Sequence, residues 1–407
     1  MIGAVVLMVS LWGVNQLLLT ALKKKHKFLA VSFLNKLYIY HLIFWLIYYL
    51  YATFNASDSK QYYARGGSYE NWLSAYGTDS KFIHFVSYPF IKTIGFSYES
   101  TMVLFSWFGF LGFVYFYLFF KENNKLNVKF KGYDLITLVL FLPNMHFWTA
   151  SLGKGSLIFM GIGMFAYAMK TPHKRVMSLL LGSFVVYNIR PHMFLFLAVG
   201  AIVGYFTGKE KVPLYQKLLV YVAFAGGTFL LMDNILAVAG LDSENTLDSF
   251  ETFADRQSGY LAKAGSGVDI SSYPLPLKLF TFWFRPLFVD APGALGIFVS
   301  FENLFYLLLA LQLLDKDFIP FLKNSPSLVK MSLVIFIAAS IALSFVMSNL
   351  GIAMRQKSMV MYFLFFVIIS FMEYKKQKKI NLMKLKRRKL EEHSSPVLPI
   401  HPTPTLP

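Results

Sequence analysis

The chain has 407 residues, of which 56% are hydrophobic and only 15% charged, whereas a soluble domain carries about 25% charged residues. The mean hydropathy of +0.52 and several apolar runs long enough to cross a hydrocarbon layer of about 30 Å predict a membrane protein and exclude soluble enzyme folds. The net charge of +18 does not indicate nucleic-acid binding, because the basic residues alternate with apolar segments. Because the chain has no cysteine, disulfides, thiolate catalysis and iron–sulfur clusters are excluded.

Apolar runs bounded by charged clusters predict an all-α integral membrane protein with about eleven transmembrane helices. The runs fall near residues 2–20, 37–54, 101–120, 135–149, 156–169, 176–189, 193–207, 214–232, 296–314, 331–349 and 358–372. Three of them, near 135–149, 156–169 and 176–189, are short for a span.

The distribution of charge predicts that the N-terminus lies outside and the C-terminus inside. With this orientation, 27 of the 39 Lys and Arg residues are cytoplasmic, which is the bias that the positive-inside rule expects. Two outer segments, 55–99 and 233–295, are too long to be simple connections and are expected to contain helices.

The predicted organisation is one polytopic domain, residues 1–375, followed by a basic cytoplasmic segment, 376–390, and a tail, 391–407. The basic segment is expected to contact anionic lipid head groups, or else to act only as a topology anchor. The tail is rich in Pro and Ser and is expected to be disordered.

The first outer segment begins with an acidic residue directly beyond an apolar run. Asp58 holds this position, and Tyr62 and Tyr63 follow four and five residues later. If the segment forms a helix, these side chains lie on the rim of an outward-facing cavity. The structural alternative is that Ser57 or Asp58 caps a helix N-terminus.

His146, Trp148 and Lys154 are predicted to meet at one outer hairpin tip. A single His or Lys at a helix end is more often an anchor that reaches the interface than a ligand. Two features favour a site here. Gly153 and Gly155 allow close approach of a backbone, and a lysine at a helix N-terminus adds to the positive field that attracts an anion.

Further cations fall on the same predicted side, at two hairpin turns and in the second outer segment; they are Arg190, His192, Arg355, Lys357, Arg256 and Arg285. Unpaired cations close to a membrane raise the free energy of the folded protein unless they bind a partner or a ligand. A phosphate or diphosphate would offset that cost through two-pronged arginine contacts and the point charge of Lys or His. The sequence therefore predicts a substrate that carries phosphate.

Four of these features occur together: Asp58 with Tyr62 and Tyr63, the hairpin from Pro143 through His146 and Trp148 to Lys154, Ile189-Arg190-Pro191-His192, and Arg355-Gln356-Lys357. In this combination the chain resembles polytopic bacterial glycosyltransferases of the GT-C superfamily and the related O-antigen and exopolysaccharide (Wzy-like) polymerases. The resemblance covers the layout of residues 50–375 through short, degenerate motifs. In GT-C enzymes the catalytic acid usually follows the first span, whereas Asp58 follows the second.

The resemblance implies a sugar donor on polyprenyl phosphate or diphosphate, a saccharide or lipid-linked acceptor, and a multi-pass protein of the bacterial inner membrane whose site faces outward. The departure in the position of Asp58 implies either an extra N-terminal helix or a substrate-binding role for this residue.

Sugar transfer from a lipid phosphate needs a base for the acceptor hydroxyl and stabilisation of charge on the departing phosphate. The sequence predicts Asp58 as the base, with His146 or His192 as the fallback. Phosphate binding is assigned to Arg190, His192, Arg355 and Lys357, with accessory roles for Lys154, Arg256 and Arg285. Aromatic faces for sugar rings are assigned to Tyr62, Tyr63 and Trp148, although an interfacial aromatic belt explains Trp148 equally well.

No cofactor is expected. Asp58 with Glu302 or Asp255 is a candidate set for a divalent cation, but nothing in their spacing requires one.

The rival class of function is a transporter or flippase of a lipid-linked saccharide, which needs polar groups through both halves of the bilayer. An acyltransferase or peptidase is less favoured, because the histidines lie on the outer side and no protease motif is present.

Overall fold

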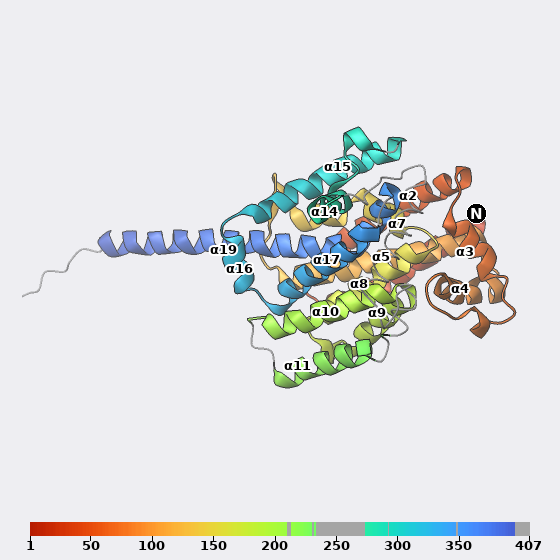
Figure 1. Ribbon diagram of the computed structural model, residues 1–407, viewed down its shortest axis with the longest axis horizontal. Helices are drawn as coiled ribbons and strands as arrows, with labels where there is room; N and C mark the ends of the chain where they lie inside the picture. The colour runs from red at the N-terminus through yellow and green to blue at the C-terminus, as the bar shows by residue number, and fades with distance from the viewer. Residues whose placement is uncertain (210–212, 230–231, 233–272, 292, 347–348, 395–407) are drawn as a thin grey trace, which may run out of the picture.

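The protein is all-α over the part of the chain that is described. The computed structural model describes residues 1–209, 213–229, 232, 273–291, 293–346 and 349–394. Within these residues the only sheet is a two-stranded antiparallel hairpin, β1 (Lys129–Phe130) and β2 (Tyr133–Asp134). The predicted fold class is therefore confirmed at the level of an all-α architecture (Figure 1).

The first half of the chain contains α1 (Ile2–Lys25), α2 (Val31–Phe54), α3 (Asp58–Gly66), α4 (Ser80–Tyr88), α5 (Tyr98–Asn123), α6 (Leu135–Leu140), α7 (Pro143–Thr149), α8 (Lys154–Ala168), α9 (Val176–Ile189) and α10 (Pro191–Thr207). The second half contains α11 (Leu214–Tyr221), α14 (Leu275–Phe284), α15 (Gly293–Ala310), α16 (Phe318–Lys323), α17 (Ser327–Val346), α18 (Leu350–Gln356), the 3-10 turn η7 (Lys357–Met359) and α19 (Met361–Ser394).

Several of these helices have the length and composition of membrane spans. Among the described residues, five are long and apolar enough to cross a bilayer, in α1, α2, α5, α15 and α17, and the bent pair of α18 and α19 would make a sixth. The outward face of α1 is apolar, since the side chains of Ile2, Val9 and Leu17 are 84%, 67% and 76% exposed. A surface of this kind is stable in lipid and not in water, which indicates a membrane-embedded protein.

Where the structure describes them, the remaining apolar runs form shorter helices, so fewer helices are long enough to cross a bilayer than the eleven that the sequence suggests. The run near 135–149 is broken into α6 and α7 at Phe141 and Leu142, directly before Pro143. Fifteen helical residues extend only about 22 Å, which is less than the hydrocarbon thickness.

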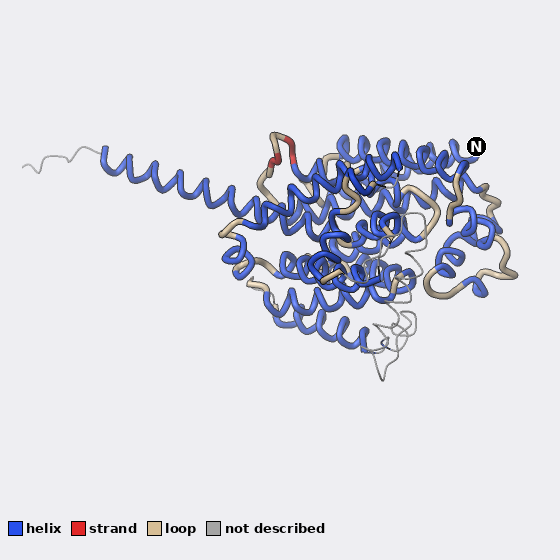
Figure 2. The backbone as a smooth tube through the Cα atoms, turned by 45° about the horizontal axis from the view of Figure 1, so that its top comes forward, coloured by secondary structure: helices blue, strands red, loops and turns tan. Residues whose placement is uncertain are grey.

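The expected helical content of the outer segments is confirmed where it is described. The segment 55–99 contains α3 and α4, and the end of the second segment contains α14. Most of the second segment, residues 233–272, lies outside the described residues. The basic segment 376–390 is not a separate unit, because it continues α19 without a break (Figure 2). Residues 391–394, at the start of the expected tail, continue this helix, and 395–407 lie outside the described residues.

The bundle has two distinct ends (Figure 1). The end that carries α3 and α4, here called the loop end, also holds the first residues of α8 and α10. The opposite end carries α16, and α19 projects from it; we call it the tail end. Because α8 and α10 run from one end to the other, residues at their two termini belong to different sites.

Glycines allow the central helices to approach closely. A Cβ on Gly163 of α8 would lie 2.9 Å from the carbonyl oxygen of Gly112 in α5, and a Cβ on Gly182 of α9 would lie 2.7 Å from that of Gly161. Small residues at such contacts let backbones pack directly, which is how helices associate in lipid. One turn along α5 from Gly112, aromatic rings pack against α19, with 4.6 Å between the ring centroids of Phe116 and Tyr362.

Gly163→Val tests this packing. The added side chain meets the α5 backbone, which cannot move aside as a side chain can, so we expect a loss of roughly 1–3 kcal/mol of stability. Thermal unfolding in detergent, with size-exclusion chromatography, measures it. Gly13→Val is the matched control, since no atom lies within 4 Å of its Cβ position. Equal stability of the two variants would contradict the close approach of α5 and α8.

Candidate active site

An ion pair joins the segment between α3 and α4 to the start of α8. The Nζ of Lys154 donates to both carboxylate oxygens of Asp79 at 2.6 Å. The Lys154 side chain is only 15% exposed, whereas that of Asp79 is 48% exposed. Partial burial raises the pKa of Asp79, but the bonds from Lys154 more than reverse this, so that it lies below the ordinary value of an aspartate.

Asp79 adopts a backbone conformation that is unfavourable for a side chain. Its φ is 60° and its ψ −124°, and its N–H donates to the carbonyl oxygen of Asn188 at 2.7 Å. Non-glycine residues in this region cluster at functional sites. The sequence analysis missed Asp79, because nothing in its neighbours along the chain separates it from other acids of the loop.

A second ion pair connects Asp58 with Arg355. The Nη1 of Arg355 donates to Asp58 Oδ2 at 2.8 Å, and its guanidinium lies 5.9 Å from the ring centroid of Trp148. Asp58 begins α3, but the capping hydrogen bond is made by Ser57, whose Oγ accepts from the N–H of Ser59 at 3.3 Å. The Asp58 carboxylate therefore points to Arg355 rather than capping its own helix.

Arg190 and His192 flank the junction between α9 and α10. The Arg190 guanidinium is within electrostatic range of Arg355, Asp79 and Tyr62, and no hydrogen bond or ion pair joins it to another described residue. His192 lies within range of Arg190, Asp79 and Lys154. Burial, with a smaller effect of Arg355, lowers the pKa of Arg190 to about 10, so the group stays protonated at neutral pH.

Tyr62 forms part of the wall of this group, and Tyr63 does not. The Tyr62 ring is 8% exposed, lies 5.9 Å from the ring of His84 and covers Gly153, where a Cβ would be 3.4 Å from it. Tyr63 points away and donates its hydroxyl to the carbonyl oxygen of Phe96 at 2.9 Å. We call the assembled residues the loop-end cluster: Asp58, Tyr62, Asp79, Trp148, Lys154, Arg190, His192 and Arg355.

His146 lies in the core and not at the hairpin tip where the sequence analysis put it. Its Nε2 donates to the carbonyl oxygen of Leu140 and its Nδ1 lies by Nδ1 of His41, both at 2.8 Å. Its ring stacks on Phe113 with 4.0 Å between centroids, and the residue has no exposed surface. The break before α7 turns this face of the helix inward, so His146 cannot reach a substrate at the cluster.

Lys357 and Arg285 lie in a second polar group beside the cluster. The buried Nζ of Lys357 donates to Asn303 Oδ1 and to the carbonyl oxygen of Arg285, both at 2.7 Å, and the guanidinium of Arg285 pairs with Asp290. These bonds tie η7 to α15. Arg256 and Asp255 lie outside the described residues.

Asn144 joins this second group to the cluster. Its N–H donates to Glu302 Oε2 at 2.8 Å, its Nδ2 donates to the carbonyl oxygen of Met354, and its Oδ1 accepts from Trp148 Nε1, both at 3.0 Å. Glu302 also accepts from the Tyr306 hydroxyl. The side chain of Glu302 therefore orients α7 through the N–H of Asn144. Glu302 is not part of a metal site, since the described residues contain no group of three or more His, Cys, Asp or Glu placed to hold a metal ion.

An apolar groove of about 260 Å³ lies directly beside the cluster, between α2, α7, α15 and α18. Its lining residues are Phe44, Ile47, Pro143, Asn144, Phe147, Trp148, Leu295, Phe298, Val299 and Met354. Phe298 and Ile47 are 52% and 43% exposed on the lipid-facing surface. Trp148 belongs to both the groove and the cluster, so a hydrocarbon chain in the groove would end next to Arg355.

The comparisons with known proteins identify no relative of this chain. No protein-family model matches the sequence, and neither the curated proteins nor the solved structures searched contain a match.

Proposed function

We propose that the protein is a membrane glycosyltransferase or polysaccharide polymerase that transfers sugar from a polyprenyl-phosphate or polyprenyl-diphosphate donor to an acceptor hydroxyl. One observation carries the proposal: Lys154, Arg190 and Arg355 gather with two carboxylates next to an apolar groove. A phosphate joined to a long hydrocarbon chain matches both parts of this arrangement.

The charge of the loop-end cluster favours a bound anion. Among the described residues, its three cations face two carboxylates, Asp58 and Asp79, so cations outnumber acids in the cluster. Arg190 has no ion-pair partner among the described residues, and isolated charges at low dielectric are costly. A phosphate would neutralise the excess and accept hydrogen bonds from a guanidinium.

Asp58 is the proposed base. In the absence of substrate its carboxylate is paired with Arg355, so Oδ2 is occupied by the guanidinium. A donor phosphate competes for Arg355, and the released carboxylate then accepts the proton of the acceptor hydroxyl. The hydroxyl oxygen bonds to the anomeric carbon, the bond from that carbon to the phosphate oxygen breaks, and the polyprenyl phosphate or diphosphate leaves with the electron pair.

We further propose that the loop end faces outward from a bacterial inner membrane and that the shorter helices complete about eleven spans. The charge distribution along the sequence supports this orientation. Shorter helices such as α8 and α10 remain within the bilayer in this proposal, because their neighbours bury them.

A transporter or flippase of a lipid-linked saccharide is the second candidate. The observation in its favour is a second cavity, of about 620 Å³, at the tail end of the same helices. A carrier needs polar sites at both ends of its path, whereas a transferase needs only the site where the sugar moves.

Cysteine labelling tests the orientation. Ser74, in the exposed segment between α3 and α4, and Lys384, on the exposed part of α19, lie at opposite ends of the molecule. With an impermeant thiol reagent and intact cells, Ser74→Cys should be labelled at once and Lys384→Cys only after permeabilisation. The native chain has no cysteine, so it is the blank. The reverse pattern would overturn the orientation.

Arg190→Lys and Arg355→Lys test the phosphate site. Each keeps the charge but loses the two-pronged contact, so sugar transfer should fall about 10- to 100-fold with folding unchanged. Transfer from a polyprenyl-linked donor by purified protein measures it. Arg65→Lys, at an exposed arginine of α3, is the matched control. Wild-type transfer by both test variants would remove these arginines from the site.

Asp58→Asn tests the base. Because Ser57 makes the capping bond, the variant should fold normally, while loss of a base lowers transfer on the order of 100- to 10,000-fold. Glu70→Gln, an exposed acid of the same loop, serves as the control. Donor binding is followed separately.

Asp79→Asn is made in parallel. If it abolishes transfer while Asp58→Asn does not, the base is Asp79. If Asp58→Asn loses donor binding but not chemistry, Asp58 is a ligand. No transfer by the wild type from any lipid-linked donor would favour the transporter.

A further inference from the structure

An exposed group of aromatic rings lies on the segment between α3 and α4. Trp72 and Tyr76 are 47% and 48% exposed, and both rings contact the ring of Phe85 in α4. Trp72 stacks on Phe85 with 4.9 Å between centroids and 9° between planes, so its exposed area lies on the other face and the edges. Tyr76 meets Phe85 at 5.2 Å and 79°. We call Trp72, Tyr76 and Phe85 the aromatic platform.

Hydrogen bonds fix both exposed rings of the platform. The Nε1 of Trp72 donates to the carbonyl oxygen of Phe85 at 2.8 Å. The hydroxyl of Tyr76 donates to Asn188 Oδ1 at 3.0 Å. The rings are therefore held in one orientation before any ligand binds, which reduces the conformational entropy that binding would cost.

The platform differs from an aromatic belt at a membrane surface. In a belt, the N–H of tryptophan and the hydroxyl of tyrosine reach the wet head-group region. Here both groups are bonded within the protein, to Phe85 and Asn188. The segment between α3 and α4 also lies at the extreme loop end, beyond the N-terminus of α1 (Figures 1 and 2). The rings therefore face water rather than hydrocarbon.

The platform is continuous with the loop-end cluster. Asn188 accepts the Tyr76 hydroxyl with its side chain and the N–H of Asp79 with its carbonyl oxygen. Three residues separate Tyr76 and Asp79 along the chain, so their Cα atoms are at most about 11 Å apart. α4 makes a second connection, because the ring of His84 lies 5.9 Å from that of Tyr62. A chain-like ligand on the platform can therefore continue into the cluster.

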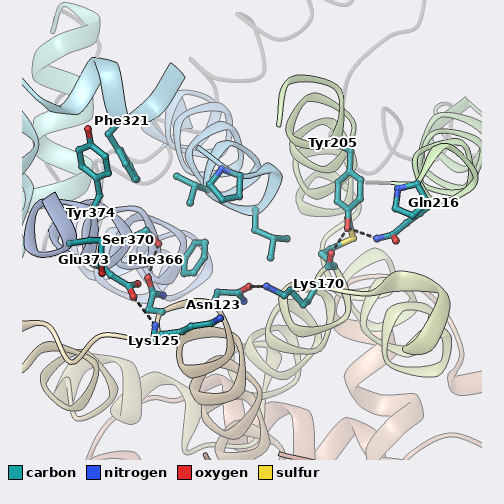
Figure 3. A pocket seen from close by; sticks show the side chains of 17 residues that line it. Asn123, Lys125, Lys170, Tyr205, Gln216, Phe321, Phe366, Ser370, Glu373 and Tyr374 are labelled. Carbon is teal, nitrogen blue, oxygen red and sulfur yellow. Dashed lines mark hydrogen bonds between the residues drawn. The ribbon is translucent and has the colours of Figure 1, made fainter. Parts of the chain in front are cut away.

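The cavity at the tail end is too far from the cluster to hold a second substrate of the same reaction. It has a volume of about 620 Å³ (Figure 3). Lys154 of the cluster begins α8, and Met169, directly after α8, lines this cavity. The fifteen residues of α8 extend about 22 Å, so a molecule in the cavity cannot present a hydroxyl to Asp58.

A flat aromatic face in water suits a sugar ring. The face of an aromatic ring carries negative potential, and a pyranose presents C–H groups of partial positive charge. The sugar hydroxyls remain in water at the ring edge, so the contact buries apolar surface without leaving polar groups unbonded. A protein partner is less well suited, because a stable interface takes about 20–30 residues a side. Within residues 67–79, the exposed large apolar side chains are those of Trp72, Leu73 and Tyr76.

We propose that the aromatic platform binds the saccharide chain of the acceptor. A sugar unit behind the reacting one stacks on the exposed face of Trp72, Tyr76 lines the path towards Asp79, and the reacting hydroxyl lies in the loop-end cluster. The inference rests on the proposed function and narrows it, since an acceptor that uses the platform is an oligosaccharide and not a single sugar.

Glycan binding tests the platform without any assay of sugar transfer. Purified full-length protein, in a detergent without a sugar head group, is applied to an array of bacterial surface-polysaccharide fragments that carry neither lipid nor phosphate. The wild type should bind a subset of the fragments. Trp72→Ala should weaken this binding about tenfold, and Trp72→Phe, which keeps a ring face, only about twofold. Leu73→Ala, at a neighbouring side chain that is 76% exposed, is the matched control and should bind like the wild type. Thermal unfolding checks that each variant is folded.

A transfer assay separates this proposal from the proposed function. Trp72→Ala should raise the KM for an oligosaccharide acceptor about tenfold and leave kcat and the KM for the donor near their wild-type values. Binding of glycans that depends on Trp72, without transfer from any donor, would keep the saccharide site and remove the transferase. Transfer with an unchanged acceptor KM in Trp72→Ala would keep the transferase and remove the platform.

Three further results would overturn the proposal. The first is that the wild type binds no fragment on the array. The second is an equal loss of binding in Trp72→Ala and Leu73→Ala, which would indicate an unspecific apolar surface. The third is quenching of Trp72 fluorescence by brominated lipids in nanodiscs, measured as the difference between the wild type and Trp72→Phe, which would place the ring in the membrane.

Discussion

The ion pair between Lys154 and Asp79 is the contact on which the loop end depends. A lysine ammonium at the start of an apolar helix is mostly withdrawn from water, and without a carboxylate it would be an uncompensated charge. Asp79 supplies that carboxylate from a different segment. The same residue bonds through its N–H to the carbonyl oxygen of Asn188, so the ends of α8 and α9 and the start of α4 form one unit.

A second constraint acts on the other side of the cluster. The break in the run 135–149 leaves free N–H groups at the start of α7, and the side chain of Glu302 accepts one of them at Asn144. Asn144 in turn holds Trp148 and the backbone of α18, which carries Arg355. The acid in α15 is thus part of the frame that sets the distance between the apolar groove and the cationic group.

The two ends of the bundle both combine basic side chains with an apolar wall, but their acidic side chains bind different groups. Both place basic residues where helices end, and both put an apolar wall next to them. They differ in the acid beside the cavity: Asp58 and Asp79 pair with cations of the cluster, whereas Glu373 at the tail end accepts backbone N–H groups.

The sequence by itself determined the fold class, because a chain in lipid must satisfy its backbone hydrogen bonds within helices. It also predicted that Asp58, Lys154, Arg190 and Arg355 lie on one side of the molecule, and in the structure these four side chains lie within electrostatic range of one another or of a shared partner. Only the tertiary structure decided which residue pairs with which. The orientation of the short helix α7 places His146 in the core, where its ring lies against His41. Lys357 is only two residues from Arg355, yet its side chain binds Asn303 and does not join the cluster. Asp79 joins the cluster through contacts with residues 75 and 109 positions away along the chain, and no local pattern encodes a contact of that kind.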